Sequence, residues 1–134
     1  MVEKPTAAFI LALIGAILVL VGGILVAITF AIGGAFLAGL GAVVPFAGFI
    51  GALFLIIAVV HLVFGVIMLI GAMWINSADM GKVRNGSIIV LIFSIIGLLF
   101  GAGFYIGSIL GLVGGILGLT WKPTEAAPPP MPPP

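Results

Sequence analysis

His61 is the only ionisable side chain within the longest uncharged stretch of this sequence. It stands in the stretch from Pro5 to Ala78, which contains no Lys, Arg, Asp or Glu. If that stretch crosses a membrane, an ionisable group at this depth is costly and indicates function by default. His61 would then act in a proton relay, as a haem or copper ligand, or as a contact to a partner subunit. The structural alternative is a neutral imidazole hydrogen-bonded to a neighbouring hydroxyl or carbonyl group.

Other chemistry has little support in the sequence. A proton relay needs carboxylates in series and a metal site needs several ligands, whereas the chain has one histidine and no cysteine. The three acidic residues lie outside the long apolar stretches, so no serine, histidine and acid come within reach of one another. We therefore expect no catalytic residues, no metal and no cofactor. His61 is kept as a possible intramembrane polar site.

The charged residues are few and lie in three tight clusters. Only 5% of the 134 residues are charged and 64% are hydrophobic, whereas about 25% of the residues in soluble domains are charged. A net charge of +1 gives no reason to expect binding to nucleic acid. Such composition predicts helices embedded in a lipid bilayer. The clusters are Glu3 and Lys4; Asp79, Lys82 and Arg84; and Lys122 and Glu125.

The spacing of the clusters predicts an all-α integral membrane bundle of four transmembrane helices. Two spans in each uncharged stretch place all three clusters on one side, which the positive-inside rule makes cytoplasmic. Both termini are then cytoplasmic and the protein is a multi-pass protein of the cell membrane. Three or five spans would instead place one cluster on the opposite face. The expected helices cover about 6–30, 46–75, 82–101 and 105–121.

Two segments are expected to be irregular. The glycine-rich connection 31–45 ends in Pro45, and glycine and proline interrupt helices, so we expect it to lie in the outer interface or to re-enter the membrane. The tail 123–134 is rich in proline and follows the membrane domain 1–122. Such a tail is either disordered or an extended ligand for an aromatic groove, and we expect disorder.

Small residues at helical spacing predict how the helices pack. Water gives no drive to pair helices in lipid, so close backbone approach and interhelical hydrogen bonds must do so. The same ridges would serve contacts within one chain or between chains, which leaves a homo-oligomer open. The glycines expected to pack are Gly97 and Gly101 in the third helix, and Gly107, Gly111 and Gly115 in the fourth.

Several local patterns resemble a known group of proteins. Pro5-Thr6-Ala7-Ala8 opens the first span, which carries Gly15 and Gly22-Gly23, and a polar loop covers Asn76 to Asn85. Gly-Phe-Tyr-Ile at 103–106 and Gly-Gly-Ile-Leu-Gly-Leu at 114–119 complete the pattern. From Pro5 to Lys122 the chain is similar to small four-span prokaryotic membrane proteins of unknown function, often archaeal. The resemblance implies the four-span layout and no activity or site residue.

The sequence predicts a non-enzymatic protein of structural or accessory type. Two features favour packing of the protein against itself or against a larger membrane complex. The connections between paired spans carry no charge, and glycine ridges run along the helices. The alternative is a small oligomeric channel or transporter with His61 near the pathway, favoured by the lone polar group at depth. The expected partners of the protein are the lipid bilayer and either a second copy of itself or a larger membrane complex. No nucleic acid is expected.

Overall fold

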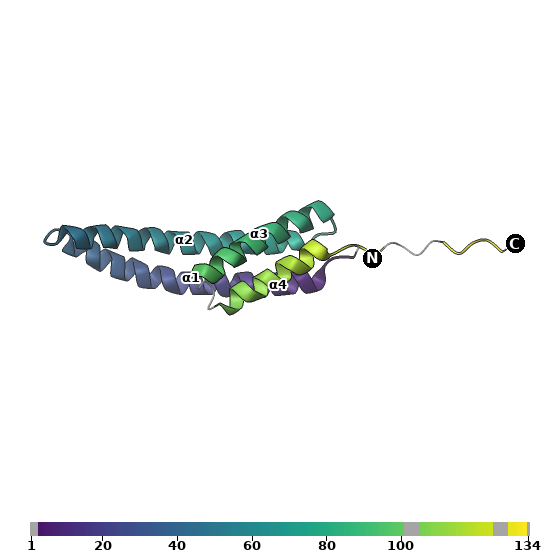
Figure 1. Ribbon diagram of the computed structural model, residues 1–134, viewed down its shortest axis with the longest axis horizontal. Helices are drawn as coiled ribbons and strands as arrows, with labels where there is room; N and C mark the ends of the chain where they lie inside the picture. The colour runs from purple at the N-terminus through teal and green to yellow at the C-terminus, as the bar shows by residue number, and fades with distance from the viewer. Residues whose placement is uncertain (1–2, 101–104, 125–128, 134) are drawn as a thin grey trace.

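A computed structural model describes residues 3–100, 105–124 and 129–133 of the chain, and every regular element in them is a helix. Three of the helices are long and apolar enough to cross a membrane, whereas the fourth has 15 residues. The expected all-α fold is therefore confirmed in these residues, and the chain is a multi-pass membrane protein. The helices are α1 (Thr6–Leu40), α2 (Pro45–Ile75), α3 (Met80–Phe100) and α4 (Ile106–Thr120) (Figure 1).

Local sequence signals explain where α2 and α3 begin. Pro45 occupies the first turn of α2, where its missing N–H would have no helical partner in any case. Asp79 precedes α3, and its Oδ1 accepts a hydrogen bond from the backbone N–H of Gly81 at 2.8 Å. Its carbonyl accepts the first helical bond, from the N–H of Val83 at 3.0 Å. Asp79 is thus an N-cap, which satisfies a donor that the helix itself leaves unpaired.

The prediction of an irregular connection over 31–45 is wrong. α1 continues to Leu40, and a short turn then leads into α2. The glycines in this segment serve packing rather than termination. A Cβ at Gly34 would lie 2.8 Å from the carbonyl oxygen of Gly51 in α2, so glycine here allows two helix backbones to approach. A helix also satisfies every backbone group internally, which apolar surroundings require. The other helix ends agree with expectation to within two residues.

The helices form an uneven bundle. α1 contacts α2 and α4, and α3 contacts α2 and α4, whereas α1 and α3 barely touch. Figure 1 shows α3 and α4 side by side with only one half of the long α1–α2 hairpin. We call residues 24–56, beyond the reach of α3 and α4, the arm, and the remaining helical residues the base. At 1.5 Å per residue, the arm extends about 25 Å beyond the base.

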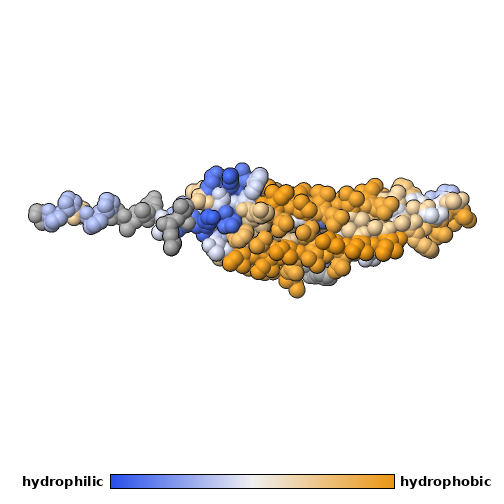
Figure 2. Space-filling model, turned by 180° about the vertical axis from the view of Figure 1, so that it is seen from behind, coloured by the Kyte–Doolittle hydropathy of each residue, from blue (hydrophilic) through white to orange (hydrophobic). Residues whose placement is uncertain are grey.

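The buried core lies in the base. Its members are small or medium-sized side chains, so the helices approach closely around it. Large apolar side chains instead cover the outside of the molecule, where lipid would contact them (Figure 2). The core residues are Ala8, Ala12, Ala16, Val19, Met68, Ala72, Ile75, Val83 and Val90.

The tail contains neither helix nor strand in its described residues, 123–124 and 129–133. Its disorder stays a prediction, as does the division of the chain into a membrane domain and a tail. Glu125 and Gly101 lie outside the described residues, as do Gly103 and Phe104 of the Gly-Phe-Tyr-Ile pattern.

Candidate functional site

His61 lies on α2 at the junction of base and arm, and its side chain is half-buried. Its Nδ1 lies 2.9 Å from the carbonyl oxygen of Ile57, one turn earlier. Because a carbonyl oxygen only accepts, Nδ1 must carry the proton and donate this bond. A Cβ at Gly23 of α1 would lie 2.9 Å from the carbonyl oxygen of His61. The histidine therefore sits where α1 and α2 approach closely.

The surroundings of His61 are apolar. A cavity of about 170 Å³ opens beside it, lined also by Ile57, Val60, Phe64 and Phe100. Phe64 meets Phe93 of α3 edge to face, with ring centroids 4.9 Å apart. No set of three metal-ligating side chains occurs in the part of the chain that the structure describes. The site therefore consists of one imidazole, hydrogen-bonded to its own helix, beside a cavity suited to an apolar group. A functional role for His61 stays a prediction.

The glycines of α4 face two neighbouring helices rather than one. Toward α1, a Cβ at Gly107 would lie 2.9 Å from the Cβ of Leu18, and one at Gly114 would lie 2.5 Å from the backbone nitrogen of Ala12. Conversely, a Cβ at Gly15 of α1 would lie 2.6 Å from the backbone nitrogen of Gly111. No side chain fits in these gaps, because real Cβ atoms do not approach backbone so closely. α1 and α4 therefore pack backbone against backbone.

Toward α3, the neighbours of the α4 glycines are serines. A Cβ at Gly115 would lie 3.1 Å from the carbonyl oxygen of Ser87, and one at Gly111 would collide with the hydroxyl of Ser94. The Ser87 hydroxyl donates to the carbonyl oxygen of Val83 at 2.7 Å. The Ser94 hydroxyl is fully buried and has no hydrogen-bond partner among the described residues. Gly111 thus lies between α1 and α3, in close contact with both.

One close contact of the base carries no recognisable signal in the sequence. Gly71 of α2 and Gly86 of α3 face each other, and a Cβ at Gly86 would lie 2.8 Å from the Cβ of Trp74. Neither glycine has a partner at four-residue spacing, which is the pattern that drew attention to α4. Gly97 of α3 is buried, in agreement with a packing role.

The charged residues gather at one end of the base. Figure 2 shows the hydrophilic surface at the end from which the tail leaves, and Figure 1 shows that α1 begins and α4 ends there. The carboxylate of Glu3 accepts a hydrogen bond from the backbone N–H of Thr124 at 2.7 Å, which joins the residues before α1 to the start of the tail. This bond lowers the pKa of Glu3 below its ordinary value, because it stabilises the ionised form.

Comparison of the chain with protein-family models, curated proteins and solved structures finds no match. The resemblance to small four-span prokaryotic membrane proteins therefore stays a prediction.

Proposed function

We propose that the protein is a non-enzymatic accessory protein of the cell membrane, whose arm packs against transmembrane helices of a larger membrane complex. The base holds the chain in the bilayer with its charged end and both termini on the cytoplasmic side. A second copy of the chain is the other partner that the sequence allows.

The observation that supports this proposal is the length of α1, which runs from the base to the end of the arm. α1 has 35 residues and is therefore about 52 Å long, whereas the hydrocarbon core of a bilayer is about 30 Å thick. A tilt of about 40°, at the top of the usual range, accommodates only about 39 Å of helix. With the charged end of the base held at one interface, the end of the arm extends past the opposite edge of the hydrocarbon.

The end of the arm is nevertheless apolar. Phe36 is 68% exposed, Val43 is 83% exposed and Phe46 is 70% exposed, and residues 24–56 contain no charge. Inside hydrocarbon such exposure costs little, but beyond it the side chains would contact water. A protein surface that covers them removes that cost, which makes the arm the contact region of an accessory protein.

The geometry favours this function over the channel or transporter with His61 near the pathway. The imidazole donates to its own helix, and the cavity beside it is lined by apolar groups. Proton or ion flux in liposomes that is lost in His61→Ala would reverse this preference.

The test is site-specific photocrosslinking in native membranes. A benzoylphenylalanine at Phe46 reports on the arm, and the same group at Ile10, which is 47% exposed on the base, is the matched control. We expect a discrete protein adduct from position 46 and lipid adducts from position 10. Mass spectrometry of the adduct distinguishes a larger complex from a second copy of this chain. Lipid adducts alone from both positions would contradict the proposal.

A further inference from the structure

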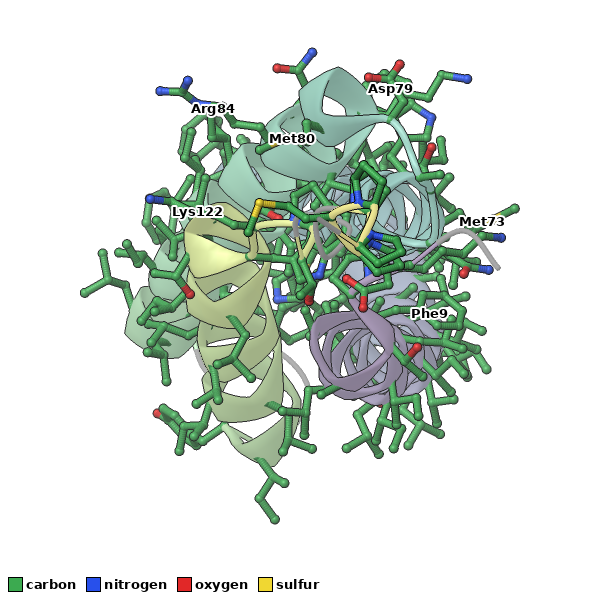
Figure 3. All side chains as sticks on the ribbon, turned by 90° about the vertical axis from the view of Figure 1, so that its right-hand side faces the viewer. Phe9, Met73, Asp79, Met80, Arg84 and Lys122 are labelled. Carbon is green, nitrogen blue, oxygen red and sulfur yellow. The ribbon has the colours of Figure 1, made fainter. Side chains whose placement is uncertain are left out.

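A groove at the charged end of the base combines features that the accessory function does not use. It lies between the first turn of α3 and the last turn of α4 and has a volume of about 490 Å³. Two basic side chains, Arg84 from α3 and Lys122 from the residues after α4, line it. Figure 3 shows both on the same side of this end of the molecule. We propose that this groove binds the phosphate of an anionic phospholipid, held between Arg84 and Lys122.

The charge of the groove is not balanced by its neighbours. Neither Arg84 nor Lys122 forms an ion pair with an acid in the described part of the chain, and no acidic side chain lines the groove. Asp79 caps α3 through Gly81, and in Figure 3 it points away from both basic groups. Glu3 is bonded to the backbone of Thr124. An anion that enters the groove therefore meets two cations, while Asp79 and Glu3, the acidic residues that the structure describes, accept hydrogen bonds elsewhere.

The remaining lining indicates a lipid rather than a soluble phosphate. Met80, Val83, Leu119 and Trp121 supply apolar surface next to the cations. A phospholipid has the matching arrangement, because its phosphate lies beside its acyl chains at the membrane interface. Tryptophan also prefers this level of the bilayer. Basic pockets between transmembrane helices on the cytoplasmic side are suited to anionic headgroups.

A second groove at the same end provides an internal comparison. It lies between α1 and α4, has a volume of about 250 Å³ and shares Trp121 with the first. Lys4 is the one charged side chain in its lining. It also has apolar lining, from Pro5, Ala8 and Leu117, but one cation instead of two, so the first groove is the better phosphate site.

The test is native mass spectrometry of the full chain from mixed micelles that contain equal amounts of phosphatidylglycerol and phosphatidylcholine. The double variant Arg84→Gln with Lys122→Gln removes the two groove cations. The double variant Lys4→Gln with Lys82→Gln removes the same charge from the same end and is the matched control. At about fivefold per basic residue, the first variant should lose about 25-fold of the preference for phosphatidylglycerol. The control should keep most of it.

Further variants and ligands sharpen the result. Asp79→Asn keeps an N-cap acceptor but removes the acid that precedes α3, so it should strengthen the preference. Unchanged thermal stability of the groove variant in neutral detergent shows that the loss is not due to unfolding. Equal losses in both double variants, or no preference in the unaltered protein, would overturn the proposal. Displacement of bound phosphatidylglycerol by inorganic phosphate alone would overturn the assignment to a lipid.

Discussion

The base and the arm are made of the same apolar and small residues, yet they differ in how many neighbours each helix has. In the base every helix contacts two others, and Gly111 lies against both α1 and α3. In the arm α1 and α2 contact each other through Gly34 and Gly51, and residues such as Phe36 are exposed. Glycine therefore marks close helix contacts in both regions but does not reveal how many helices meet there.

The largest effect is expected from a bulky residue at the centre of the base. Gly111→Leu would force α4 away from α3 and α1, because even a Cβ at this position collides with Ser94 and lies 2.8 Å from Met68. We expect a loss of at least about 3 kcal/mol in stability, measured by thermal unfolding in detergent.

Gly39→Leu in the arm is the matched control, because a Cβ there has no heavy atom within 4 Å. It should leave the unfolding temperature unchanged. Equal loss in the two variants would remove the distinction between base and arm.

A smaller and local effect is expected inside the arm. A Cβ at Gly51 would lie 2.5 Å from the carbonyl oxygen of Gly34, so Gly51→Ala should separate the two arm helices at a cost of about 1–3 kcal/mol. Because the arm contacts no third helix, the base should stay intact. Spin labels at Phe36 and Phe49, attached through introduced cysteines in a chain that has none, would report a longer and broader distance.

Gly33→Ala is the control for this experiment, since its Cβ would meet Phe54 at an ordinary 3.9 Å. A distance distribution that Gly51→Ala leaves unchanged would contradict the close contact within the arm.

Much of the fold could be predicted from charge placement and apolar length. The distribution of charge located the ends of the helices near Lys4, Asp79 and Lys122, because ionised groups cannot enter hydrocarbon. The prediction of a break after residue 30 failed for a physical reason. Glycine interrupts helices in water, where other backbone conformations are well solvated, but between two apolar helices it allows contact and the helix continues to Leu40.

The candidate site was less predictable. The sequence identified His61 because ionisable groups are rare at depth. It did not show that the carbonyl oxygen of Ile57, one turn earlier, accepts a hydrogen bond from the imidazole Nδ1. Regular spacing identified Gly107 and Gly111, whereas Gly71 and Gly86 meet across two helices and carry no local pattern. Contacts between segments distant in the sequence depend on how each helix is rotated about its own axis. Because these helices are apolar on every face, the sequence does not determine that rotation.

A third prediction concerns the polar groups inside the base. Ser94→Ala removes a buried hydroxyl that has no partner in the described residues, so it should leave stability unchanged or raise it by up to about 1 kcal/mol. Ser87→Ala removes a hydroxyl that donates to Val83 and should lower stability by about 0.5–1 kcal/mol. Chemical or thermal unfolding of both variants measures the difference, and a larger loss in Ser94→Ala would show that this hydroxyl has a partner.

The smallest effect distinguishes the two ends of the molecule. Glu3 joins the start of α1 to Thr124 beyond α4, whereas the turn at the end of the arm is held by backbone bonds within residues 38–47. The pKa of Glu3 is lowered by the bond from Thr124, so the bond contributes fully above the ordinary value of 4.5 and is lost as pH falls through the lowered pKa. The amide resonance of Thr124 should therefore titrate with a midpoint below 4.5. In Glu3→Gln that titration should disappear, because the amide has no proton to gain in this range, while amide resonances of the arm should not change with pH in either protein. A Thr124 titration that persists in Glu3→Gln would mean that another acid holds this end of the base together.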